Sequence, residues 1–276
     1  MTAVVPRLRC PVCARPLAVD GRRLTCAAGH GVDVARQGYV NLAVGARARS
    51  GDTAGMVAAR ARFLDAGHYA PVSAALAQLA AELVPAARFA VDVGGGTGHH
   101  LARVLDALPA ADGACLDSSA HALRRAARAH PRSAAVGADA WRALPLAGGC
   151  ADLVTTVFAP RAAAEVARVL RPGGTWVVLT PRPDHLAQVR AALGMLGVDG
   201  RKDERLAADL AALAPAAVRE LSVVRPLGRA ALRDLVLMGP SAHHVREADL
   251  DERLARLPEV VDVTVAVRLT AVTRPA

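Results

Sequence analysis

Apolar residues recur at two different spacings along residues 71–276, and these spacings predict the secondary structure. Over 72–84 the spacing is helical, with Val72, Leu76, Leu79 and Leu83 on one face. Short β-rich runs then predict strands over 89–93, 114–117, 134–138, 152–158 and 175–180. Helical stretches, each closed by a proline, separate these runs and cover 99–108, 119–130 and 161–170. Strands that alternate with helices in this way predict βαβ units and a parallel sheet.

The rest of the chain adds more helices, one long strand and a short turn-rich segment. Further helices are predicted over 54–65, 185–197, 204–213 and 229–237. Residues 260–272 alternate, which predicts a strand at the edge of the sheet, paired antiparallel with 221–226. We divide the chain into a Cys/Arg-rich zinc-binding module over 1–36, a basic connector over 37–70 and an α/β domain over 71–276.

Positive charge is concentrated near the N-terminus. The formal net charge is +9, and residues 1–70 hold ten arginines and four acidic residues, a surplus of six. An anionic partner would therefore meet the N-terminal part. The first residues lack the apolar core of a signal peptide, and no uncharged apolar run reaches the roughly 18 residues of a membrane span. We expect a cytoplasmic protein that does not bind a membrane.

Four side chains of metal-ligand type lie close together, in the pattern C-x2-C-x12-C-x3-H. Two tight turns joined by a hairpin would gather Cys10, Cys13, Cys26 and His30 into a closed tetrahedral site, which is typical of a structural zinc ion. A catalytic zinc is less favoured because no position is left for water. The alternative is a set of unrelated buried thiols and a surface histidine. The two remaining cysteines stand alone, as expected in a reducing cytosol.

A glycine-rich turn follows the first predicted strand of the α/β domain, in the run FAVDVGGGTGHH from Phe89 to His100. Glycines let the backbone approach a ligand closely, but such a turn alone also suits a dinucleotide. The next two predicted strands run into Asp117 and Asp139. An acid at the first of these positions can hold both ribose hydroxyls. Capping of the following helix is the alternative role for both carboxylates.

The order of these motifs, completed by DLVTTVF from Asp152 and EVARVLRPGG from Glu165, resembles class I, Rossmann-like S-adenosylmethionine methyltransferases. The resemblance implies an α/β fold with a mostly parallel seven-stranded sheet behind the small zinc module. It also implies the cofactor contacts. The methionine and ribose would lie along Gly94, Gly96 and Gly98, the ribose on Asp117 and the adenine amino group on Asp139.

Three runs in the first 71 residues carry a more specific resemblance. They are LRCPVCARPL from Leu8, ARQGYVNL from Ala35 and GDTAGM from Gly51, the last continuing to Gly67-His68-Tyr69-Ala70-Pro71. They are similar to the bacterial 23S rRNA (guanine-N1)-methyltransferases, which include enzymes that confer tylosin-type macrolide resistance. This family implies a homodimer that methylates a guanine N1 in the domain II hairpin of 23S rRNA lining the peptide exit tunnel. It further implies cofactor contacts from Tyr69, Thr97, Gly98 and His185.

Arginines of the first 70 residues would contact RNA phosphates without reading sequence; they are Arg22, Arg23, Arg47, Arg49, Arg60 and Arg62. A solvated arginine-rich face is the alternative. The proton on guanine N1 must leave during transfer, and Asp184 and His185 are acceptor candidates by position alone. Phe158 would either stack on the guanine or pack in the core.

Two other functions fit part of the sequence. A small-molecule methyltransferase with a structural zinc module explains the glycine-rich turn but not the basic segment. A zinc-ribbon nucleic-acid binder explains residues 1–70 but leaves the cofactor motifs unused. Binding of S-adenosylmethionine and methylation of ribosomal RNA distinguish these hypotheses from one another.

Overall fold

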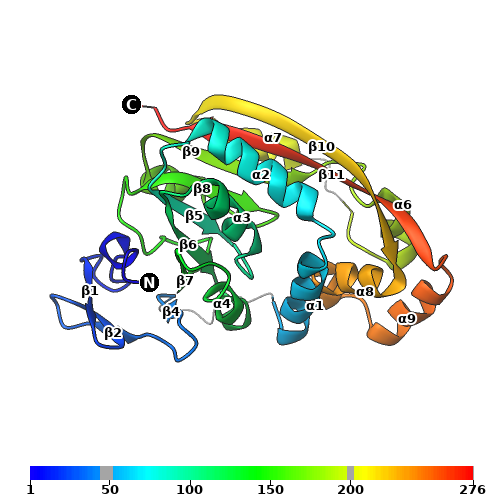
Figure 1. Cartoon of the computed structure of the whole chain (residues 1–276), viewed down its shortest axis with the longest axis horizontal. Coiled ribbons are helices and arrows are strands. Elements are labelled where there is room, and N and C mark those ends of the chain that lie inside the picture. Colours follow the sequence, from blue (N-terminus) through cyan, green and yellow to red (C-terminus); the bar gives the residue numbers. More distant parts are fainter. Residues whose placement is uncertain (44–51, 198–201, 276) are drawn as a thin grey trace.

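The computed structural model describes residues 1–43, 52–197 and 202–275, and its centre is one large sheet (Figure 1). Within these residues the sheet has eight strands in the order β10-β11-β9-β8-β5-β6-β7-β4. Neighbouring strands from β9 to β4 pair in parallel, whereas β11 is antiparallel to both β9 and β10. The strand bounds are β4 Val40–Asn41, β5 Phe89–Val93, β6 Asp112–Asp117, β7 Ser133–Gly137, β8 Ala151–Val157, β9 Leu170–Pro181, β10 Ala214–Gly228 and β11 Val260–Thr273.

The predicted Rossmann-like sheet is confirmed, but the predicted seven strands are one too few. The eighth is β4, which the connector contributes by pairing Val40 and Asn41 with Val136 and Gly137 of β7. A two-residue strand has no alternation to recognise in the sequence. The predicted antiparallel pairing of 260–272 with 221–226 is confirmed by the long β10–β11 ladder.

Helices cover both faces of the sheet. Their bounds are α1 Ala54–Asp65, α2 Ala70–Leu83, α3 His99–Ala107, α4 Ala120–Ala126, α5 Ala163–Val169, α6 Ala187–Leu193, α7 Lys202–Leu210, α8 Arg229–Leu237 and α9 Glu247–Ala255. Each predicted helix corresponds to one of these, whereas α9 was not predicted. Its two buried apolar residues, Leu250 and Leu254, stand among charged ones, so its apolar stripe is too narrow to recognise.

Alternate residues of the central strands enter two separate cores, as the pleat of a strand requires. In β5, Phe89, Val91 and Val93 face one core, and Ala90 faces the other. The core containing Ala90 is closed by α2, α3 and α4 and, further along the sheet, by α6, α8 and α9. The opposite core is closed by α5, α7 and the N-terminal residues. Both faces of the parallel strands β5 to β9 are thus shielded from water, as is usual for a parallel sheet, whereas the edge strand β10 is largely exposed.

The N-terminal residues pack directly on the sheet. They form a small antiparallel sheet of β1 (Leu17–Asp20), β2 (Arg23–Cys26) and β3 (Gly31–Asp33), preceded by a short 3-10 turn. Leu8 is fully buried and forms an isolated bridge with Leu146. The Arg9 N–H donates to Pro145 O (2.9 Å), and the Arg7 guanidinium lies 4.5 Å from the centre of the Phe89 ring. Residues 138–150 contain no helix, so the N-terminal module covers this part of the sheet instead.

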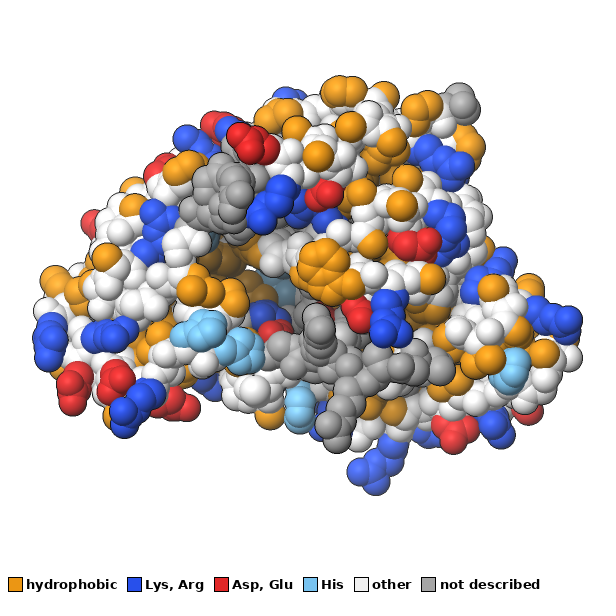
Figure 2. All heavy atoms as spheres, turned by 180° about the vertical axis from the view of Figure 1, so that it is seen from behind, with side chains coloured by type: hydrophobic (Ala, Val, Ile, Leu, Met, Phe, Trp, Pro, Cys, Tyr) orange, Lys and Arg blue, Asp and Glu red, His pale blue; other side chains and the backbone are white. Residues whose placement is uncertain are grey.

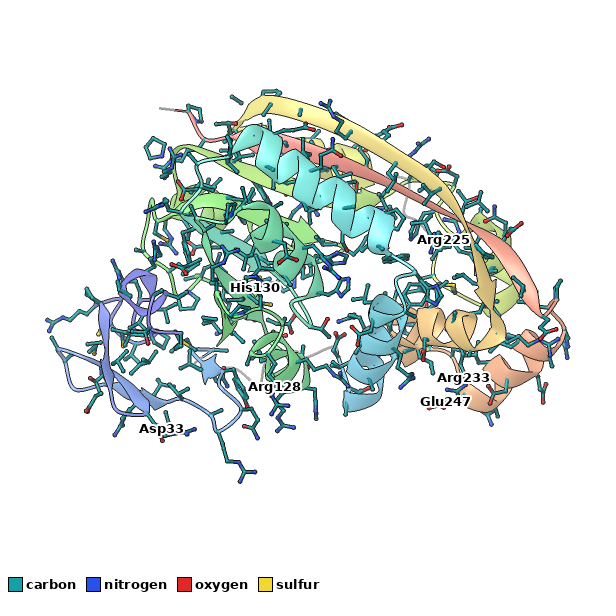
Figure 3. The ribbon with its side chains drawn as sticks, in the orientation of Figure 1. Asp33, Arg128, His130, Arg225, Arg233 and Glu247 are labelled. Atoms are coloured by element: carbon teal, nitrogen blue, oxygen red, sulfur yellow. The ribbon has the colours of Figure 1, made fainter. Side chains whose placement is uncertain are left out.

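Ion pairs join the helices beside the sheet ends. Arg62 of α1 forms a bidentate pair with Asp234 of α8. Arg233 of α8 contacts Glu247 (2.6 Å) and Asp251 (3.0 Å) of α9, and Figure 3 shows Arg233 and Glu247 lying together. No helix among the described residues has the length and apolar character needed to cross a membrane.

Candidate cofactor site and metal centre

One cavity of about 760 Å³ opens at the carboxyl ends of the parallel strands. Figure 2 shows one face of the molecule hollowed near its middle, with hydrophobic side chains inside the hollow and basic side chains at its rim. In open α/β sheets, ligands bind at this end of the strands. The usual place is where the chain order changes direction, which in this sheet is at β5, with β6 on one side and β8 on the other. Seven of the eight predicted cofactor residues line the cavity: Tyr69, Gly94, Gly96, Thr97, Asp117, Asp139 and His185.

The eighth residue, Gly98, lies behind the cavity and begins α3. Its φ is +77°, and a Cβ at this position would lie 3.2 Å from Ala126 Cα and 2.9 Å from Ala129 Cβ. Only glycine fits both the left-handed backbone and the close approach of α4. Gly98 therefore shapes the glycine loop (residues 94–98) without lining the cavity.

The glycine loop is held from below by the next strand. The N–H groups of Gly94 and Gly95 both donate to Leu116 O, at 2.8 and 3.0 Å. A Cβ on Gly95 would lie 2.6 Å from Cys115 Sγ and 2.7 Å from Asp92 Oδ2. The loop thus lies flat on the ends of β5 and β6, and its upper surface is left for a ligand.

The two aspartates at the strand ends line the cavity and also hold the backbone. Asp117 Oδ2 accepts from Gly96 N (2.9 Å), and Oδ1 accepts from Ser119 N (2.8 Å). Asp139 Oδ1 accepts from Trp141 N (2.9 Å). Neither carboxylate caps a helix: the Ser119 side chain caps α4, and no helix follows Asp139 before β8. The bonds to turn backbone do not compete with ligand binding, because a carboxylate has further lone pairs.

Tyr69 and His185 meet although 116 residues separate them. Tyr69 Oη lies 3.2 Å from His185 Nε2, and both side chains are buried in the cavity wall. Ala266 N–H donates to His185 Nδ1 at 3.2 Å. Because a backbone N–H only donates, neutral His185 carries its proton on Nε2 and donates it to Tyr69. Burial raises the pKa of Tyr69, so its hydroxyl stays protonated.

Two further titratable groups, Asp92 and His100, are buried beside the loop. Asp92 Oδ1 accepts from Thr155 Oγ1 (2.8 Å), and no described residue provides a partner for Oδ2. Burial raises the pKa of Asp92 to about 7, although Thr155 acts in the opposite direction. His100 Nδ1 contacts Ser73 Oγ at 2.9 Å, and burial lowers its pKa to about 3. The apolar run around Asp92 is a sequence signal from which its burial could be predicted, whereas no local pattern signals the contact between His100 and Ser73.

The metal-ligand side chains converge as predicted. The ligand atoms of Cys10, Cys13, Cys26 and His30 all lie within 4.8 Å of one another. His30 Nδ1 is 3.6 Å from Cys10 Sγ and 3.5 Å from Cys26 Sγ, and the Cys13 and Cys26 sulfurs are 3.6 Å apart. Ligands of a tetrahedral zinc ion at about 2.0–2.3 Å lie roughly 3.3–3.8 Å apart. The four residues therefore fit a Cys3His zinc site.

The four described arginines that were predicted to contact RNA fall into three groups. Arg22 and Arg23 are exposed on the β1–β2 hairpin of the zinc-binding module. Arg60 lies in the cavity wall, paired with Asp52 and donating to Met238 O. Arg62 is exposed but paired with Asp234. The remaining two, Arg47 and Arg49, lie outside the described residues.

Comparisons with known proteins match both parts of the chain. Residues 8–44 match the zinc-ribbon family model described as "RlmA, N-terminal", and residues 90–174 match the model described as "Methyltransferase domain". A crystal structure of a protein from Bacillus halodurans, described as a methyltransferase, covers 74% of this chain and 99% of its own, with a TM-score of 0.51 and 17% identity. That likeness shows the fold alone.

Relatives that match over nearly the whole chain identify a narrower family. A 23S rRNA (guanine(748)-N(1))-methyltransferase of Streptomyces fradiae is 50% identical over 99% of this chain and 98% of its own length. A protein of Micromonospora griseorubida, named for the same guanine-N1 reaction on 23S rRNA, is 49% identical over 96% of this chain and 97% of its own. The methyltransferase domain and the Cys3His cluster give the chain two cofactors, S-adenosylmethionine and structural zinc. The chain belongs to the family of 23S rRNA (guanine-N1)-methyltransferases.

Proposed function

We propose that this protein transfers a methyl group from S-adenosylmethionine to N1 of a guanine in the domain II hairpin of 23S rRNA that lines the exit tunnel. The observation that carries the proposal is the 50% identity, over 99% of the chain, to a protein named for guanine-N1 methylation of 23S rRNA. The cavity supports it, because its glycine loop and strand-end carboxylates suit this cofactor. We also propose that the modification protects the ribosome against macrolides.

The cofactor would be held by the residues that line the cavity. Asp117 faces the ribose, Asp139 the adenine, and the glycine loop with Thr97 the methionine part. Tyr69 accepts from His185 and can donate its own hydrogen to the ligand. When bound, S-adenosylmethionine supplies a methyl group whose bond to sulfur breaks as the bond to guanine N1 forms, while the N1 proton leaves to solvent.

Orientation is therefore the main contribution that we assign to the protein. Both ring nitrogens of His185 are engaged, by Tyr69 and Ala266. Asp184 is not part of the cavity wall and lies 3.6 Å from Arg182. Neither residue is retained as the acceptor of the N1 proton.

The division into a zinc-binding module (1–36), a basic connector (37–70) and a methyltransferase domain (71–276) remains part of the proposal. The exposed Arg22 and Arg23 would contact RNA phosphates, as would Arg47 and Arg49. We propose a cytoplasmic location, because the RNA substrate is cytoplasmic in bacteria. We also propose a homodimer, as the family resemblance implies. Arg23 Nε also lies 3.7 Å from Asp33 Oδ1, but both side chains are well exposed. The closer pairs of Arg60 with Asp52 and of Arg62 with Asp234 leave Arg60 and Arg62 the weaker candidates for RNA contact.

The decisive experiment is methyl transfer from labelled S-adenosylmethionine to unmodified 23S rRNA, with the modified base located by a reverse-transcription stop. We expect one stop, at a guanine of the domain II tunnel hairpin. Expression in a susceptible host should raise the inhibitory concentration of tylosin. Cofactor binding without incorporation into RNA would instead favour a small-molecule methyltransferase.

A further inference from the structure

The cavity extends beyond the cofactor residues, toward the ends of β8 and β9. The sheet order is β9-β8-β5-β6-β7, so the end of β8 lies on the opposite side of β5 from Asp117 and Asp139. Three strand spacings separate β8 from β7, which is roughly 14 Å. Residues after β8 and β9 also line the cavity, among them Phe158, Pro160 and Leu196. This part has room for a second ligand beside the cofactor.

Phe158 combines an uncommon backbone conformation with an exposed aromatic side chain. Its φ is +51°, one of three positive values at non-glycine positions among the described residues. Such a conformation costs on the order of 1–3 kcal/mol and persists where the surroundings or a function require it. The residue is 42% exposed, in a chain in which only 3% of the residues are aromatic. A phenylalanine kept exposed at a strained position is not explained by packing alone.

The Phe158 ring packs against two other rings in the cavity wall. Its centroid lies 5.7 Å from that of His185 and 6.1 Å from that of Tyr69. Tyr69 and His185 are themselves joined by their hydrogen bond. The Phe158 ring is therefore held in place while part of its surface stays open to the cavity.

The next residue reaches the glycine loop. A Cβ built on Gly94 would lie 2.5 Å from Ala159 Cβ. The chain after Phe158 thus touches the part of the loop that would hold the methionine end of the cofactor. Phe158 is therefore adjacent in the chain to a residue that contacts the loop proposed to hold the methionine part of the cofactor.

We propose that the Phe158 ring is the surface on which the target guanine stacks during methyl transfer, an inference that rests on the proposed function. Guanine N1 lies on the pairing edge of the base, and enzymes that modify such atoms take the base out of its stack. Stacking on an aromatic ring replaces the lost stacking and leaves the edge of the base free in its plane. The base is thereby presented edge-on to the methyl group.

The test uses three full-length variants and unmodified 23S rRNA. Phe158→Tyr keeps the ring and should keep kcat/KM within about threefold of the wild type. Phe158→Leu and Phe158→Gly remove the ring and should lower kcat/KM by about 5- to 150-fold, which corresponds to the roughly 1–3 kcal/mol of one base–aromatic stack. Calorimetric affinity for S-adenosylmethionine should be unchanged in all three.

Phe158→Gly separates function from folding, because glycine relieves the positive φ. We expect a melting temperature at or above that of Phe158→Leu, together with lost RNA methylation. A hairpin with 2-aminopurine at the target position should fluoresce more strongly when bound to Phe158→Gly than when bound to the wild type, since the ring no longer quenches the base.

Two results would overturn the stacking role. One is wild-type methylation by Phe158→Leu and Phe158→Gly. The other is a parallel loss of cofactor affinity, which would place Phe158 in the cofactor site. A wild-type enzyme that leaves 23S rRNA unmodified is a different result, because it contradicts the proposed function itself.

Discussion

Asp92 is the fourth residue of β5, in which every side chain is buried. An ionised carboxylate in this position costs free energy, and burial raises its pKa to about 7. Between about pH 4 and pH 7 the folded protein therefore holds a proton that the unfolded chain has released. By linkage, this group stabilises the fold less and less as the pH rises through that window.

The prediction concerns Asp92→Asn, which cannot ionise. The predicted quantity is the free energy of unfolding of Asp92→Asn minus that of the wild type, both free of cofactor. This difference should increase by roughly 2–4 kcal/mol between pH 4 and pH 8. Urea titrations across this range measure it. The comparison with the wild type removes the contribution of His100, which is the same in both proteins. Because the pKa of His100 is lowered to about 3, its contribution to stability is lost as the pH falls below about 6.5, the opposite direction to that of Asp92. A pH-independent difference would show that Asp92 ionises normally.

Asp117 is the carboxylate for which we predict a direct effect on the cofactor. Asp117→Ala removes the proposed ribose contact and frees Gly96 N, so S-adenosylmethionine affinity should fall about 10- to 100-fold. Asp152→Ala is the matched control, because Asp152 Oδ2 accepts from Arg88 N and Phe89 N, both at 2.9 Å, and lies outside the cavity wall. It should lose stability but bind cofactor normally. Equal affinity losses in calorimetry would contradict the assignment.

Sequence motifs located most of this chemistry because the residues are local. The glycine loop and the zinc ligands each lie within about 20 residues of chain. The hydrogen bond between Tyr69 and His185 spans 116 residues, so no spacing pattern could predict it. Arg60 was predicted to contact RNA from the basic composition of the connector, but it lies in the cavity wall, where it donates to Met238 O, 178 residues away in the sequence.

At the scale of elements, the fit of the glycine loop against α4 can be tested with two glycines. Gly98 and Gly67 both have φ of +77°, but a Cβ on Gly67 meets nothing within 4 Å, whereas one on Gly98 meets α4. Gly67→Ala should cost about 1–2 kcal/mol through backbone strain alone. Gly98→Ala should cost a further 1–3 kcal/mol, approximately, through overpacking.

Urea unfolding of both variants measures the difference. Equal losses would mean that α4 moves aside without cost, and that Gly98 serves only the turn.

The elements themselves were largely predictable, because apolar periodicity in the helices and short β-rich runs in the strands distinguish the two. The α1 bounds 54–65 and the β5 bounds 89–93 agree with the prediction. The failures are β4, which is too short to show a pattern, and α9, in which charged residues surround two leucines. In both, tertiary contacts rather than local pattern decide the structure.

At the scale of the whole molecule, the zinc-binding module and the sheet share one hydrophobic core. Loss of the metal should therefore affect the entire chain. Cys13→Ala should lower zinc content, reduce the melting temperature of the whole protein in one transition, and lower RNA methylation at least about 100-fold. The fraction that stays folded should bind S-adenosylmethionine with nearly normal affinity.

Cys150→Ala is the matched control, because Cys150 is a free thiol outside the metal cluster. It should retain zinc by metal analysis and retain methylation. A two-step melting curve for Cys13→Ala would show that the module and the sheet unfold independently.

The bridge between Leu8 and Leu146 also has a consequence for synthesis on the ribosome. The two residues lie 138 positions apart, so at about 5–20 residues per second the zinc-binding module waits roughly 7–28 s for the surface it packs against. During that interval, metal rather than burial must hold the nascent module together. Growth under zinc starvation should therefore reduce the yield of native enzyme through misfolding of newborn chains, before any finished molecule loses its metal.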